Sequence, residues 1–304
     1  MKGLKKAASM RVRPHHFFAC ILLIASGHLF AGEPLWTRVL SGDVAAGPLS
    51  RADRVFLSGT DRTVTCLSEK GSFLWSRPVP GKIGGLLTVL KSGIVLASSG
   101  SGTITALNVD GLFLWRVNSA DAPLVAPYEG RDGRIFLIYR NRIVCISQTA
   151  TVKWTVPLSE SPGNIVSETG SGDLLVSLSS GAIIRVSPFG QLLERVALSD
   201  TPTQMTATGP GFICGFSSGT VRCYDVRDGR AGTARKATED IWEYRTGSSI
   251  VSFASGEGTL CVLSRDGSLC GINVTDGTLL WKTGPGIGVA GSASIDYGYG
   301  QFNV

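Results

Sequence analysis

The chain has 304 residues, of which 39 are glycine, 43% are apolar and only 17% are charged. This composition is too apolar for a disordered chain, and the length suits two average domains or one large all-β domain. The formal net charge of +6 suggests nucleic-acid binding, but residues 1–31 hold five basic residues and no acidic one. Beyond them 24 basic and 23 acidic residues remain, so no nucleic-acid partner is predicted.

Residues 1–31 have the three parts of a secretory signal peptide. A basic stretch up to His16 precedes the apolar run Phe17–Ile24 and a group of small residues that ends at Gly27. The run is shorter than the about 20 residues of a membrane span. We expect cleavage after Gly27 or Ala31, with Ala31 favoured. The mature chain then has no transmembrane span and is exported to the periplasm or the periplasmic face of the outer membrane.

The remaining chain, residues 32–304, is organised by a repeat of about 40 residues. All six tryptophans lie on one phase of this period: Trp36, Trp75, Trp115, Trp154, Trp242 and Trp281. Glu194 occupies the vacant place between Trp154 and Trp242. Such regular spacing indicates an internal repeat.

Each repeat is expected to contain four short β-strands and no helix. The first clear strand of each repeat is a β-rich run: Arg54–Gly59, Gly93–Gly100, Gly133–Arg140, Asp173–Ser179, Gly211–Ser217 and Gly258–Ser264. A glycine-containing turn, an alternating strand such as Thr103–Asn108 and the strand with the tryptophan follow. A looser stretch, often with a proline, leads to the next repeat.

Four strands per repeat without helices are typical of a β-propeller. Seven places on the ladder predict seven blades, with eight as the second choice, in a single domain over residues 32–304. The N-terminal segment would supply one strand of the closing blade. The C-terminus supplies about two more, Gly288–Asp296 and Tyr299–Val304, so this last blade is expected to be incomplete.

The tryptophans are predicted to be structural, each filling the wedge between neighbouring sheets. Glu194 lacks the indole ring, so a locally weaker blade contact is expected there.

One segment departs from the period, because nine additional residues lie between Gly229 and Trp242. We expect an extended, charged loop that could bind a partner, although a neutral surface insertion has the same pattern. Its candidate residues are Arg230, Arg235, Lys236 and Glu239.

The six cysteines beyond the signal segment are isolated in sequence. Cys66, Cys145 and Cys223 occupy the repeat position of Ala106, which indicates packing of a small side chain. Two pairs, Cys214 with Cys223 and Cys261 with Cys270, are each nine residues apart across a turn, so disulfides remain open. The sequence has no Cys-x-x-Cys spacing, so no metal site is predicted at the cysteines.

No catalytic residue is predicted. The histidines are His15, His16 and His28, so a mature chain that begins at Gly32 has none for acid–base catalysis or metal binding. The segment Gly215–Gly219 matches a Gly-x-Ser-x-Gly motif, but that chemistry needs a histidine and a strand-to-helix turn. A hairpin turn is the preferred interpretation.

The units Gly102–Trp115 and Gly267–Trp281 resemble the repeat of PQQ-like β-propellers. That family includes pyrroloquinoline quinone dehydrogenases and BamB-like outer-membrane protein assembly factors. The dehydrogenases carry a vicinal Cys–Cys disulfide and a calcium site of acidic residues. Neither pattern is present in this sequence, so no catalytic, metal or cofactor residue is transferred and no cofactor is predicted.

The resemblance to BamB-like factors implies a non-enzymatic envelope scaffold. Its expected partners are envelope proteins, such as the barrel-assembly machinery or unfolded outer-membrane proteins, bound through blade loops and strand edges. The alternative is a protein that binds a quinone or another small ligand in a central channel. A purely structural envelope protein is a third class.

Overall fold

The computed structural model describes residues 36–40, 42–81, 83–208, 211–225, 233–236, 240–285, 296–298 and 301–303. All regular elements in these residues are β-strands. In the same residues no helix is long and apolar enough to cross a membrane. The predicted signal peptide lies outside the described residues.

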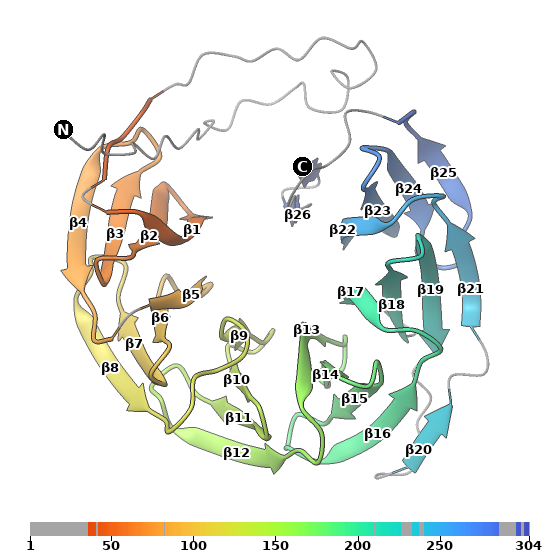
Figure 1. The fold of residues 1–304 in the computed structure, drawn as a ribbon, viewed down its shortest axis with the longest axis horizontal. Helices are drawn as coiled ribbons and strands as arrows, with labels where there is room; N and C mark the ends of the chain where they lie inside the picture. Colours follow the sequence, from red (N-terminus) through yellow and green to blue (C-terminus); the bar gives the residue numbers. More distant parts are fainter. Residues whose placement is uncertain are drawn as a thin grey trace, which may run out of the picture. The chain divides into compact units, whose positions relative to one another are not determined.

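The chain divides into two compact units, the first ending at Ser159 and the second beginning at Glu160. The single domain expected for residues 32–304 stays a prediction. The first unit holds three four-stranded antiparallel sheets (Figure 1). Sheet I contains β1 (Val44–Arg51), β2 (Arg54–Gly59), β3 (Thr63–Ser68) and β4 (Phe73–Pro78); sheet II contains β5 (Ile83–Val89), β6 (Val95–Ser99), β7 (Thr103–Leu107) and β8 (Phe113–Asn118); sheet III contains β9 (Tyr128–Glu129), β10 (Ile135–Tyr139), β11 (Arg142–Ile146) and β12 (Val152–Pro157).

The second unit holds three further sheets and a short hairpin. Sheet IV contains β13 (Pro162–Glu168), β14 (Leu174–Leu178), β15 (Ile183–Val186) and β16 (Leu192–Ala197), with β20 (Thr233–Lys236) as a fifth strand; sheet V contains β17 (Pro202–Ala207), β18 (Gly211–Phe216), β19 (Thr220–Asp225) and β21 (Asp240–Arg245); sheet VI contains β22 (Ile250–Gly256), β23 (Thr259–Ser264), β24 (Leu269–Asn273) and β25 (Leu279–Lys282). β26 (Asp296–Gly298) and β27 (Gln301–Asn303) form the hairpin.

The six β-rich runs of the sequence form the second strand of each sheet, from β2 to β23. Each of these strands has a neighbour on both sides, which explains why its residues are apolar almost without interruption. The looser, proline-containing stretch forms the first strand of the following sheet. The tryptophan strand forms the opposite edge, except in sheet IV, where β20 lies outside β16.

Neighbouring sheets within a unit pack face to face. Phe56 and Val64 of sheet I meet Val95 and Ala97 of sheet II in one fully or almost fully buried cluster. Equivalent clusters join sheet II to III, sheet IV to V and sheet V to VI. The repeat therefore builds its core between sheets, and sheets II and V each contribute both faces to these clusters.

The predicted closure of the last blade stays a prediction. β26 and β27 lie in the C-terminal segment where two strands are expected, and residues 286–295 are outside the described part. Seven blades and the incomplete last blade are likewise predictions, since the described residues form six sheets of four or more strands.

Candidate interaction surface

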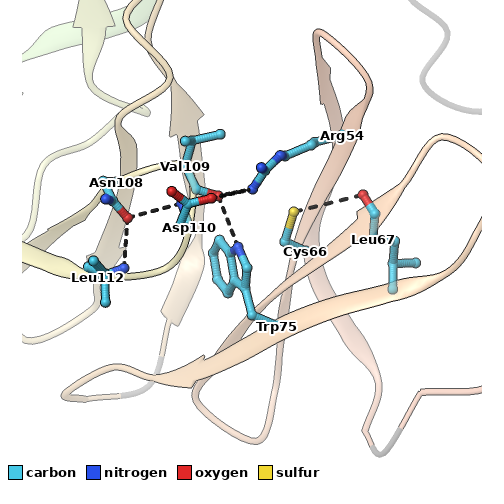
Figure 2. A network of polar contacts seen from close by, with 8 residues as sticks. All are labelled: Arg54, Cys66, Leu67, Trp75, Asn108, Val109, Asp110 and Leu112. Carbon is cyan, nitrogen blue, oxygen red and sulfur yellow. Dashed lines mark hydrogen bonds and ion pairs between the residues drawn. The ribbon is translucent and has the colours of Figure 1, made fainter.

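The tryptophan strands are fastened to the next sheet by hydrogen bonds to a turn. Figure 2 shows Trp75 of β4 beside the turn between β7 and β8, where its Nε1 donates to the carbonyl of Val109 at 2.9 Å. The Arg54 guanidinium donates to the same carbonyl at 2.6 Å and to the Asp110 carboxylate at 3.1 Å. One turn of sheet II thus accepts two donors from sheet I.

Glycine makes the close approach of this ring possible. Gly111 has a φ of +77°, and a Cβ there would lie 2.7 Å from Cδ2 of Trp75. The turn is held by the Asn108 side chain, whose Oδ1 accepts the N–H groups of Asp110 and Leu112 at 3.0 and 2.8 Å (Figure 2). The turn therefore presents a flat backbone surface to the indole.

The same contact recurs at three other tryptophans. Their Nε1 atoms donate to a turn carbonyl of the next sheet: Trp36 to Glu69 at 2.8 Å, Trp115 to Gln148 at 2.6 Å and Trp242 to Val274 at 3.0 Å. Gly71 and Gly277 lie directly beneath the rings of Trp36 and Trp242. In the turn that receives Trp115, Ala150 occupies the glycine position with a φ of 63°.

The two remaining predicted tryptophans also pack against neighbouring residues. Trp154 is half-buried and its ring centroid lies 5.8 Å from that of Phe136. Trp281 is 36% exposed and packs against Gly271 of its own sheet.

A small residue faces each of the five tryptophans that lie in strands, across the edge pair of strands. The register pairs Cys66 with Trp75, Ala106 with Trp115, Cys145 with Trp154, Cys223 with Trp242 and Gly271 with Trp281. In sheet IV the corresponding pair is Arg185 with Glu194. In sheet IV, two charged side chains of intermediate size thus stand where the other sheets have a large ring and a small residue.

These two residues form a buried ionic cluster with Asp173. Glu194 is 2% exposed, and Arg185 and Asp173 are each 6% exposed. Arg185 Nη1 lies 3.3 Å from Asp173 Oδ2, and its Nε lies 3.6 Å from Glu194 Oε2. The single cation is therefore shared by two carboxylates inside sheet IV. The position of the missing indole holds this cluster, and the locally weaker blade contact expected from the sequence stays a prediction.

The inserted segment reaches the same sheet. Its residues Thr233–Lys236 form β20, which pairs in parallel with Glu194–Ala197 of β16. Figure 1 shows β20 beyond the edge of β16, after which the chain returns to complete sheet V with β21. Part of the expected loop is therefore a strand, and it contains the predicted Arg235 and Lys236. Arg230 and Glu239 lie outside the described residues.

The edge covered by β20 differs from the other tryptophan-strand edges. On β8, Phe113 is 58% exposed and its neighbour Leu114 is also exposed. Exposed apolar pairs begin β4 and β25 as well: Phe73 with Leu74 and Leu279 with Leu280. On β16, by contrast, only the first residue is exposed, and Glu194 and Val196 are buried.

A cleft of about 390 Å³ opens in the first unit between sheets II and III. Leu86, Pro123 and Leu124 give it an apolar wall, and Asp121 and Arg140 are its charged lining residues. The Arg142 guanidinium, 2.7 Å from Asp121, donates to this carboxylate and holds its pKa below the usual range. The Asp121 carboxylate in the wall of the cleft is thus already paired with Arg142.

All six described cysteines are buried thiols. Cys214 is paired in register with Arg222 and Cys223 with Ile213, so the two thiols point to opposite faces of sheet V. Cys261 and Cys270 are offset by one residue in the same way. The nine-residue spacing therefore does not bring either pair together, because a one-residue offset reverses the face of a strand.

The part of the chain that the structure describes contains no group of three or more histidine, cysteine or acidic residues able to hold a metal ion. The motif Gly215–Gly219 lies at the turn from β18 to β19, as its interpretation as a hairpin requires.

Sequence reasoning missed Arg185 and β20. Arg185 could have been found, because it precedes Glu194 by nine residues, as Cys66 precedes Trp75. β20 has only four residues, and its partner strand lies about 40 residues earlier in the chain. No local pattern indicates it.

The repeated sheets and their tryptophan contacts resemble those of PQQ-like repeat proteins. The family model described as outer membrane protein assembly factor BamB matches residues 61–209, which confirms the resemblance seen in the sequence. No curated protein sequence matches the chain significantly.

Among solved structures, the chain is similar to the crystal structure of BamB from Moraxella catarrhalis. The TM-score is 0.63 at 14% sequence identity, over 88% of this chain and 81% of that one. At this identity the similarity shows the fold alone, an all-β propeller of four-stranded sheets.

Proposed function

We propose that the chain is a non-enzymatic scaffold of the cell envelope that assists the assembly of outer-membrane β-barrel proteins. The observation that carries this proposal is the match of residues 61–209 to the BamB assembly-factor model. The predicted signal peptide supports the periplasmic location.

The described surface suits protein partners. β4, β8, β12, β21 and β25 are edge strands, and several of them begin with exposed apolar pairs. An edge strand offers backbone N–H and C=O groups to an added strand, and apolar side chains add affinity. Rigid sheets would present these edges in fixed positions, so no chemical step is required.

A quinone-binding protein is the alternative from another class. The described residues do not favour it, because their cysteines are separated and buried and no acidic cluster accompanies them. Pyrroloquinoline quinone with calcium should neither raise the melting temperature of the purified chain nor support dye reduction. A response to both would replace the scaffold proposal.

The test in cells is removal of the gene followed by quantitative mass spectrometry of the outer membrane. We expect lower levels of β-barrel proteins, with lipoproteins and inner-membrane proteins unchanged, and recovery when the chain is restored. Unchanged barrel-protein levels, together with an unchanged rate of their assembly after pulse labelling, would contradict the proposal.

A further inference from the structure

The departures from the repeat are concentrated on sheet IV. Glu194 and Arg185 replace the tryptophan and its small neighbour, and β20 covers the edge of β16. β20 lies between β19, which ends at Asp225, and β21, which begins at Asp240, whereas only residues 108–112 separate β7 from β8 in sheet II. In a repeat protein, positions that break the local rules are the best candidates for function.

β20 demonstrates that the edge of β16 binds an extended segment. It pairs through four consecutive positions, from Glu194 with Thr233 to Ala197 with Lys236, and runs parallel to β16. The other strand pairs of the described sheets are antiparallel, and each joins two of the four strands that every sheet contains. β20 is therefore an addition to a complete four-stranded sheet, bound as an external peptide would be.

The geometry of β20 favours exchange. A parallel pair is slightly less stable per residue than an antiparallel one, and four residues form few ladder hydrogen bonds. The four-stranded part of sheet IV does not need β20, because the other five sheets have four strands each. A longer segment with more pairing positions along Leu192–Ala197 would bind the same edge better than β20.

We propose that the edge of β16 is a strand-binding site for an extended segment of a partner polypeptide, and that β20 holds this site until the partner replaces it. The segment would run parallel to β16 and bind mainly through its backbone. This inference rests on the proposed function in requiring a protein partner, but its site is separate from the other edges. The interior of the sheet remains unchanged in the exchange.

The test compares the mature chain with the double variant Ala234→Pro/Arg235→Pro. Successive strand residues direct their N–H groups to opposite sides, so one of these two prolines removes an N–H from the pairing with β16 whichever way β20 is oriented. The matched control is Arg235→Ala/Lys236→Ala, which removes two charges and keeps every backbone N–H. The probe is a fluorescein-labelled synthetic peptide with the sequence of residues 230–239, and the same peptide with two prolines is its control.

We expect the proline variant to bind the probe at least tenfold more tightly than the parent and the alanine variant. In those two proteins β20 competes at the high effective concentration of a tethered segment, which is in the millimolar range for short linkers. Amide hydrogen exchange over residues 192–198 should be at least tenfold faster in the proline variant and should return to the parent rate with the probe.

Equal probe binding by all three proteins, or unchanged exchange over β16 in the proline variant, would overturn the inference. A dimer of the parent that the proline variant loses, seen by light scattering, would also overturn it, because the occupant would then be a second copy. If the probe fails to bind while gene removal still lowers barrel proteins, only this inference fails. If the probe binds as expected and barrel proteins do not change, only the proposed function fails.

Discussion

Arg185 is the residue on which the buried cluster of sheet IV depends. It lies between Asp173 and Glu194 and is the cation that both carboxylates share. Removal of one partner from a buried ion pair costs more than the pair itself contributes, because the remaining charge loses its compensation.

Arg185→Met should therefore destabilise the protein by about 3–5 kcal/mol, and Glu194→Gln by roughly 1–3 kcal/mol, since the amide keeps the shape and loses only the charge. Urea unfolding followed by tryptophan fluorescence measures both. Arg195→Ala is the matched control on β16: its partly exposed pair with Glu160 (3.1 Å) should contribute less than about 1 kcal/mol. A loss for Arg185→Met no greater than for the control would refute a shared-cation role.

The cysteines give a second prediction at this scale. Burial raises the pKa of the Cys66 and Cys270 thiols to about 11 and that of Cys261 to about 12. Because the thiolate is the reactive form, the native protein at pH 8 should not react with a thiol reagent, whereas the urea-unfolded protein should expose every thiol. Addition of a reductant should leave the melting temperature unchanged. Rapid labelling of the native protein, or a reductant-sensitive melting temperature, would show that the thiols are accessible or paired.

The turn that receives each tryptophan is the smallest repeated element of the fold. At Gly111 the positive φ and the indole of Trp75 both exclude a side chain, whereas Gly258 has a φ of +75° with no atom within 4 Å of a Cβ. These two glycines separate the cost of backbone conformation from the cost of a steric clash.

Gly258→Ala should cost about 1 kcal/mol through backbone conformation. Gly111→Ala should cost roughly 2–4 kcal/mol, because the indole must also move. The difference in the urea midpoint measures the tryptophan contact. Equal losses for the two variants would show that the indole moves aside at no cost and does not fasten the sheets.

At the scale of elements, the sequence predicts the sheets well and the exceptional strand poorly. Period-two patterns and glycine turns determine β2, β6 and β7 locally, so their positions agree within two residues. β20 follows no such pattern, because its pairing is determined by a strand in another repeat. Strands β8 and β25, which contain Phe113 and Leu279, also follow local sequence patterns. These side chains are exposed because both strands lie at the edge of their sheets.

The whole molecule follows from the repeat only in part. The four-stranded sheets and the PQQ-like resemblance could be predicted from the tryptophan spacing and from the glycine turns that recur at the same period. The candidate interaction site could be predicted only in part. Arg185 follows from its nine-residue spacing to Glu194, whereas β20 pairs with a strand about 40 residues earlier and has no local signal.

The proposed function requires that the exposed strand edges bind envelope proteins. The most direct measurement is photo-crosslinking in intact cells, with a photoreactive amino acid placed at Phe113 on β8 or Leu280 on β25, followed by mass spectrometry of the adducts. The control position is Lys91, an exposed residue in the turn between β5 and β6. We expect adducts with a barrel-assembly component or an unfolded outer-membrane protein at both edge positions and not at Lys91. Absence of any envelope protein above background at both edges would contradict it.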